Sequence, residues 1–156
     1  MLGRYRKRPR RVLMVSQDPH WHEVVRRALG SEAQVRRVSD GESGLDALRL
    51  EPFDWVIVDT MGIPDLLQLV AAIRDQLPAL RHLIMAAAAP TWRQVRDALR
   101  AGATDFVVKS EDGHELQAVW SQPGRRCRLR LKGSWGQLLR RRRYWLQQAT
   151  GESRCA

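Results

Sequence analysis

The sequence predicts an α/β domain built on a five-stranded parallel sheet with helices on both faces. Residues 55–58 form a continuous apolar run that ends on Asp59, as expected of a strand that is covered on both faces. Four further strand-like segments alternate with segments of helical periodicity. Turn and capping residues separate these segments at the spacing of βαβ units, which favours one parallel sheet.

Each element follows from a local pattern. The predicted strands cover residues 11–15, 33–38, 55–59, 82–86 and 104–108. The predicted helices cover residues 19–29, 41–50, 66–76, 92–101 and about 111–120. The first helix has Asp18 as its expected N-cap and Pro19 at its first position, and Thr91 is the expected N-cap of the fourth. Gly30 and Gly102 end these two helices.

The basic residues are concentrated at the two ends of the chain. The net charge is +10, from 27 basic and 17 acidic residues. Residues 1–11 contain six basic residues and no acidic one, and residues 125–156 contain ten basic residues and one acidic one. Residues 12–124 therefore hold 11 basic and 16 acidic residues. The sequence thus predicts an acidic folded body with two strongly basic ends.

These patterns divide the chain into a basic N-terminal tail (1–10), one domain (11–120) and a basic C-terminal extension (121–156). In the extension, basic and apolar residues alternate over residues 126–132 with the period of a strand. An amphipathic helix pattern follows, and its apolar side could dock on the body. The arginines that are candidates for binding nucleic acid or a partner are Arg126, Arg128, Arg130, Arg140, Arg141, Arg142 and Arg143.

Three segments resemble the receiver domain of two-component response regulators, over about residues 10–120. They are residues 11–15 followed by Asp18 and Pro19, the strand that ends at Asp59, and residues 98–109. The last segment is the most specific, since a Gly-Ala pair precedes the fifth strand in this family and a lysine ends it. The resemblance implies a flavodoxin-like sheet of order 2-1-3-4-5 and a role in phosphorelay signal transduction. It makes Asp59 equivalent to the phosphoacceptor and Lys109 equivalent to the lysine that contacts the phosphoryl group.

The sequence departs from this family at several site positions. Ser16 and Gln17 stand where the family has paired acids that hold magnesium, and Asp18 lies one residue late. Ala87 stands where a hydroxyl residue follows the fourth strand. Phe106 occupies the position of the aromatic switch residue, which the family tolerates. The site is therefore degenerate, as in a pseudo-receiver.

These departures predict that phosphorylation of Asp59 is impaired or absent. Magnesium is usually held by carboxylates together with phosphate, and Asp18 and Asp59 are weak candidate ligands. Phosphoryl transfer depends mainly on charge stabilisation, and a lost hydrogen-bond donor such as the one missing at Ala87 typically costs about 2.7–4 kcal/mol. We therefore expect no enzymatic activity and no bound cofactor. We also expect an ion pair between Asp59 and Lys109.

Two functions remain open from the sequence. The first is a signal-transduction module that contacts a histidine kinase or another regulator and could form a homodimer. The second is a nucleic-acid-binding accessory protein whose basic tails contact phosphate. No apolar run reaches the length of a transmembrane helix and no signal-peptide pattern is present, so we expect a cytoplasmic location. The two cysteines, Cys127 and Cys155, match neither a disulfide framework nor a metal-site spacing.

Overall fold

A five-stranded parallel sheet forms the centre of the computed structural model, which describes residues 8–121. The strands are β1 (Arg10–Val15), β2 (Ala33–Val38), β3 (Trp55–Asp59), β4 (His82–Ala87) and β5 (Asp105–Val108). Their order, β2-β1-β3-β4-β5, confirms the predicted topology. The strand and helix predicted in the C-terminal extension lie outside the described residues.

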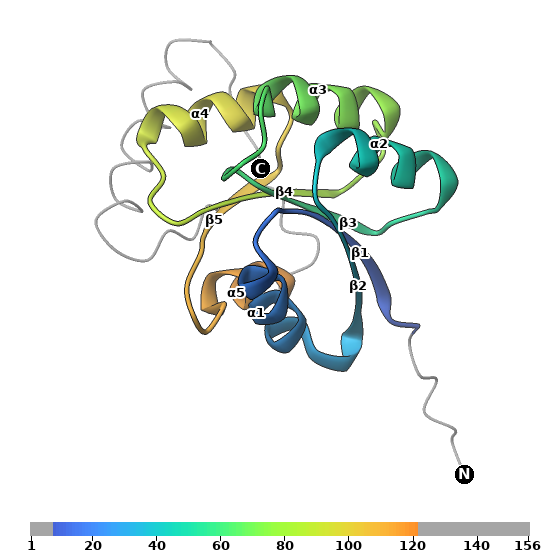
Figure 1. Ribbon diagram of the computed structural model, residues 1–156, viewed down its shortest axis with the longest axis vertical. Coiled ribbons are helices and arrows are strands. Elements are labelled where there is room, and N and C mark those ends of the chain that lie inside the picture. The colour runs from blue at the N-terminus through green and yellow to red at the C-terminus, as the bar shows by residue number, and fades with distance from the viewer. Residues whose placement is uncertain (1–7, 122–156) are drawn as a thin grey trace, which may run out of the picture. The chain divides into compact units, whose positions relative to one another are not determined.

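Helices cover both faces of this sheet. They are α1 (Pro19–Leu29), α2 (Gly41–Leu50), α3 (Leu66–Gln76), α4 (Trp92–Ala101) and α5 (His114–Trp120), with a short 3-10 helix η1 (Gly30–Glu32) after α1. Figure 1 shows α1 and α5 on one face and α2, α3 and α4 on the other. No helix within residues 8–121 is long and apolar enough to cross a membrane.

Capping side chains set the starts of three helices, and two of them, Asp18 and Thr91, are the predicted N-caps. Asp18 accepts hydrogen bonds from the second and third amides of α1, at 3.0 and 3.1 Å. Asp40 accepts one from Ser43 N at 2.8 Å, at the start of α2. Thr91 and Gln94 form a reciprocal capping box at the start of α4. Each of these caps satisfies amides that the first helical turn leaves without a partner.

The last helix begins three residues later than predicted, at His114 instead of Glu111. Gly113 explains the difference, because its backbone has a φ of +64°, in the left-handed region. A Cβ at this position would lie 2.8 Å from the Cβ of Ala28 in α1. A close approach to α1 therefore fixes the turn before α5. The sequence pattern around residues 111–113 could not reveal that contact.

The core holds the carboxyl ends of the strands in place. All five residues of β3 are buried, and Trp55 at its start is 1% exposed. Trp21 of α1 and Leu116 of α5 pack with Trp55 in the cluster on one face of the sheet. Burial of each such large side chain contributes roughly 1.5–3 kcal/mol to stability. This packing positions the residues that follow β1, β3 and β5 at one edge of the sheet.

Candidate functional site at the carboxyl edge of the sheet

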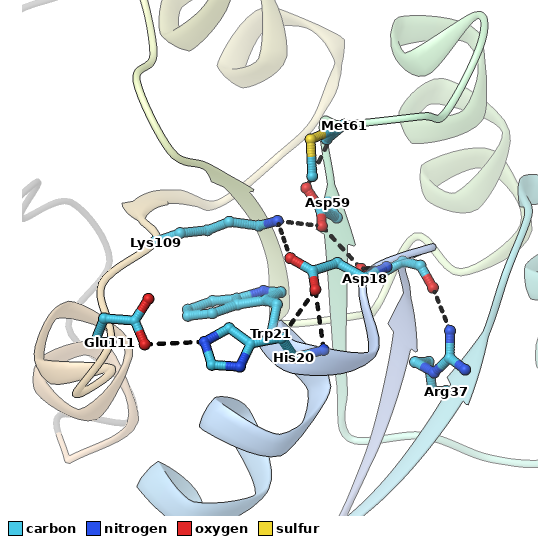
Figure 2. Close-up of polar contacts among 9 residues, drawn as sticks. Asp18, His20, Trp21, Arg37, Asp59, Met61, Lys109 and Glu111 are labelled. Atoms are coloured by element: carbon cyan, nitrogen blue, oxygen red, sulfur yellow. Dashed lines mark hydrogen bonds and ion pairs between the residues drawn. The ribbon is translucent and has the colours of Figure 1, made fainter.

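Asp59 is the last residue of β3, and its side chain is fully buried. Its Oδ2 atom lies 2.5 Å from Nζ of Lys109 and accepts a hydrogen bond of 2.8 Å from Ser16 Oγ. Its Oδ1 atom accepts a hydrogen bond of 3.0 Å from the amide of Met61 (Figure 2). Both oxygens of this carboxylate are therefore engaged within the protein.

Lys109 follows β5, and its side chain is 9% exposed. Its amide donates to Ala87 O at 2.8 Å, which ties the residue to the end of β4. The side chain reaches toward β3, and its Nζ atom lies between the carboxylates of Asp59 and Asp18 (Figure 2). The distance from Nζ to Oδ2 of Asp18 is 3.3 Å. Nζ also lies 5.7 Å from the ring centroid of Trp21. The expected ion pair with Asp59 is present, and Lys109 bridges two acidic residues.

Asp18 uses both of its oxygens in this arrangement. Oδ1 caps α1 through the amides of His20 and Trp21, while Oδ2 faces Lys109. Burial alone would raise the pKa of Asp18, but the amide of Trp21 and the Lys109 ammonium outweigh it and lower that pKa below its usual value. Asp18 is consequently a charged helix cap that also anchors Lys109.

The side chains at the end of β1 point to different partners. Ser16 is fully buried, and its hydroxyl accepts from the amide of Asp18 at 3.0 Å while it donates to Asp59. Gln17 is exposed, and its Nε2 donates to Gly62 O at 2.8 Å in the loop after β3. Gly62 has a φ of +75°, and a Cβ there would lie 2.6 Å from Oε1 of Gln17. Ser16 thus belongs to the cluster around Asp59, whereas Gln17 binds the loop beside it.

The two remaining predicted site positions carry apolar groups. Ala87 ends β4 and is 6% exposed, and its methyl group has no hydrogen-bond donor to offer. Phe106 is 4% exposed and lies inside β5, paired in register with Met85. Neither residue touches the carboxylate of Asp59 through a polar contact. The polar cluster is made of Ser16, Asp18, Asp59 and Lys109, with the amide of Met61.

This cluster is a poor donor set for a divalent cation. Magnesium requires several oxygen ligands in octahedral geometry, and usually one or two of them are carboxylates. Here Asp59 and Asp18 are the two carboxylates of the cluster, and both already contact the Lys109 ammonium. Within residues 8–121 no group of three or more His, Cys, Asp or Glu side chains could hold a metal ion. The residues present do not fit a magnesium site.

The sequence did not identify several contacts of this site. The bridge from Asp18 to Lys109 joins residues 91 positions apart, and the contribution of the Met61 amide comes from the backbone. The side chain of Trp21, which lies below Lys109 in Figure 2, was also missed. The Asp18-Pro19 pair was the available sequence indication, since it predicted that Asp18 caps a helix. The seven candidate binding arginines of residues 126–143 lie outside the described residues.

Comparison with known proteins places this chain in a family. Residues 12–120 match the response regulator receiver domain. The chemotaxis response regulator CheY4 of Vibrio cholerae has a similar structure, with a TM-score of 0.63 and 21% identity, over 72% of this chain and 97% of that one. HP1043, an orphan response regulator of H. pylori, gives a TM-score of 0.63 and 19% identity, over 74% and 97% of the two chains. The receiver domain of NtrX from Brucella abortus gives a TM-score of 0.60 and 27% identity, over 70% of this chain and 96% of that one. A search of curated proteins found no match.

The match covers most of the chain, and the sheet order and helix arrangement agree with it. Receiver domains are signal-transduction modules of two-component systems, and in general they are not enzymes. Such a domain implies interaction with a histidine kinase or another regulator. The chain belongs to the response regulator receiver domain family.

Proposed function

We propose that this receiver acts through protein contacts and that magnesium-dependent phosphorylation of Asp59 is impaired or absent. One observation carries the proposal: the ammonium of Lys109 and the hydroxyl of Ser16 both occupy Oδ2 of the Asp59 carboxylate. Asp59 is equivalent to the phosphoacceptor of the family, and Lys109 to its phosphate-contacting lysine.

The charges of the cluster oppose the transfer of a phosphoryl group. Asp59 and Asp18 contribute two carboxylates against the one ammonium of Lys109, so the site is already negative before a phosphate arrives. An incoming phosphoryl group needs charge compensation at its oxygens, because that compensation supplies most of the catalysis. The methyl group of Ala87 adds no donor, which corresponds to about 2.7–4 kcal/mol of lost stabilisation.

Protein contact is supported by the surface next to this site. Met61 is 60% exposed in the loop after Asp59, and Leu67 is 44% exposed in the first turn of α3. Large exposed apolar side chains that form a contiguous patch are typical of surfaces that bind another protein. We therefore propose a histidine kinase or a second regulator as the partner, with recognition at this edge.

The proposal is tested by treating the full chain with acetyl phosphate and magnesium and measuring its intact mass. We expect no added phosphoryl group that depends on Asp59, because neither the metal ligands nor the hydroxyl donor is present. Asp59→Asn is the control for modification at other positions. A substantial phosphorylated fraction that Asp59→Asn abolishes would overturn the proposal.

A gain-of-function variant gives the converse test. Ser16→Asp with Gln17→Asp returns two carboxylates to the end of β1, so magnesium affinity should increase, and the melting temperature should rise when magnesium is added. The matched control is Ser16→Asn with Gln17→Asn, which has nearly the same shape and no added charge. If both double variants respond equally to magnesium, the missing carboxylates are not what excludes the metal.

A further inference from the structure

Strand β2 forms one edge of the sheet, and within residues 8–121 no strand pairs with its outer side. It pairs in parallel with β1 along all six of its residues, in a continuous register without a bulge. A regular edge strand presents a row of backbone N–H and C=O groups to which another chain can bind. In the described part of the chain, the outer side of β2 is therefore open to a further strand.

The pairing with β1 identifies the backbone groups that face outward. The carbonyl oxygen of Val38 accepts a hydrogen bond of 2.9 Å from the amide of Ser16, so the backbone groups of Val38 face β1. Along a strand these groups alternate between the two sides, so those of Val35 and Arg37 face away from β1. The N–H and C=O groups of these two residues are thus positioned to pair with a sixth strand.

Arginines flank this edge on both faces of the sheet. Two lie in the last turn of α1, which packs on one face of β2, and one lies in the last turn of α2, which packs on the other (Figure 1). β2 itself contributes two more, whose side chains point to opposite faces because they are successive residues of a strand. We refer to these five residues as the β2 arginines: Arg26, Arg27, Arg36, Arg37 and Arg49.

Two of the β2 arginines have no acidic partner. Within residues 8–121, Arg27 and Arg37 form no ion pair with an acidic side chain. Arg37 instead donates from Nη1 to the carbonyl oxygen of Ser16 at 3.0 Å (Figure 2). Burial lowers the pKa of His22 in α1, and the charges of Arg37 and Arg26 lower it further. Positive charge therefore acts on the α1 side of β2.

The acidic side chains near β2 are already engaged. Glu32 precedes the strand and accepts a hydrogen bond of 3.4 Å from Nε1 of Trp120, while Asp40 follows it and caps α2. The other acidic residues are in ion pairs with arginine, namely Arg26–Glu23, Arg49–Asp46, and Glu51 with both Arg11 and Arg36. Between its two ends, β2 carries two positive charges and no negative one.

An exposed apolar side chain lies at the same edge. Leu50 is the last residue of α2 and is 79% exposed, more than any other large apolar side chain in the described residues. The next residue, Glu51, binds Arg36, which holds this end of α2 to β2. Leu50 is therefore placed to contact an aliphatic side chain of a strand that binds next to β2.

We propose that the outer edge of β2 binds an extended acidic segment of a partner protein, which adds to the sheet as a sixth strand. The backbone groups of Val35 and Arg37 pair with the segment, and the β2 arginines select its negative side chains. Leu50 contacts an aliphatic residue of the segment on the α2 side. This inference goes beyond the proposed function, whose surface is the carboxyl edge, and it does not depend on whether Asp59 is phosphorylated.

Charge argues against a second copy of this chain as the occupant. Two β2 strands paired with each other would bring arginines opposite arginines, and like charges directly opposite each other in a sheet are destabilising. A nucleic acid could bind the arginines, but it would leave the outward peptide groups and Leu50 unused. An acidic peptide strand uses all three features.

The test measures binding of the full chain to a short fluorescent peptide of alternating Glu and Val by anisotropy. The control peptide has the same side chains and is N-methylated at every residue, so it keeps its charge but donates no backbone hydrogen bond. We expect methylation to weaken binding on the order of tenfold or more, because strand pairing requires those donors. Equal binding of the two peptides would overturn strand addition, since charge alone would then account for the affinity.

A matched pair of double variants locates the surface. Arg27→Ser with Arg37→Ser changes β2 arginines, whereas Arg93→Ser with Arg100→Ser removes the same charge from exposed positions of α4. Both are measured well below their melting temperatures. We expect the first to weaken peptide binding on the order of fivefold and the second to have little effect. Equal effects would overturn the assignment to β2.

Hydrogen exchange gives a readout at the strand itself. Binding of the peptide should slow exchange at the amides of Val35 and Arg37, and unchanged exchange at both would overturn the proposed pairing. Two outcomes would overturn the choice of partner. One is a DNA duplex that binds more tightly than the peptide and is lost in the Arg27→Ser, Arg37→Ser variant. The other is a dimer of the full chain that protects these two amides without any peptide.

Discussion

The ammonium nitrogen of Lys109 lies 2.5 Å from Oδ2 of Asp59, inside a site where the carboxylate is fully buried. Two charges taken out of water depend on each other, because either one alone would bear its desolvation cost without compensation. This pair therefore governs both the stability of the carboxyl edge and the chemistry that Asp59 can perform.

Removal of Lys109 should be strongly destabilising. Lys109→Met leaves the buried Asp59 carboxylate without a counter-charge, and we expect a loss of about 3–5 kcal/mol in the free energy of unfolding. Asp59→Asn should cost less, because Lys109 keeps Asp18 as a partner. The double variant should be more stable than the sum of the two losses predicts. Urea unfolding of the four proteins measures this coupling, and strictly additive losses would show that the pair is not coupled.

The two roles of Asp18 can be separated by a pair of variants. Asp18→Asn keeps a side-chain oxygen that can cap α1 but removes the charge facing Lys109, whereas Asp18→Ala removes both. We expect Asp18→Ala to be the less stable by about 0.5–2 kcal/mol, the usual value of an N-cap. Thermal unfolding of both variants at neutral pH decides this, and equal stabilities would mean that the cap contributes nothing.

The charge of Asp18 also predicts a pH dependence. In the folded protein the pKa of Asp18 is lowered from its usual value of 3.8. The charged carboxylate therefore stabilises the folded state fully above pH 3.8, and this contribution is lost as the pH falls through the lowered pKa. The stability difference between the unmodified chain and Asp18→Asn should therefore shrink in acid. A difference that stays constant would show that the charge of Asp18 is not what distinguishes the two proteins.

Asp105 should be a destabilising residue at neutral pH. Burial at the start of β5 raises its pKa from 3.8 to about 6, so the folded protein binds more protons than the unfolded chain between these values. Stability should consequently fall as the pH rises through this window, and the full loss is present above it. Asp105→Asn should raise the melting temperature at neutral pH and flatten this decline. Parallel melting-temperature profiles for the two proteins would contradict the prediction.

Local patterns in the sequence determined most of the fold. The apolar run of β3, the caps at Asp18 and Thr91, and the glycines after α1 and α4 act over a few residues, so each could be identified without any partner. Together with the alternation of strands and helices, they fixed the class of the sheet. The resemblance to receiver domains predicted the strand order 2-1-3-4-5, and the structure confirms it. Because Asp59 ends one strand and Lys109 directly follows another, the sequence also placed them at one edge of the sheet.

Only the tertiary structure decided how those residues are used. The contact of Arg10 with Trp120 spans 110 positions, and that of Lys109 with Asp18 spans 91. Such contacts depend on which strands are neighbours and on how far each side chain reaches across them. The start of α5 likewise depended on the approach of Gly113 to α1. Local propensity carries no information about these distances, because they arise when burial of the apolar faces brings distant segments together.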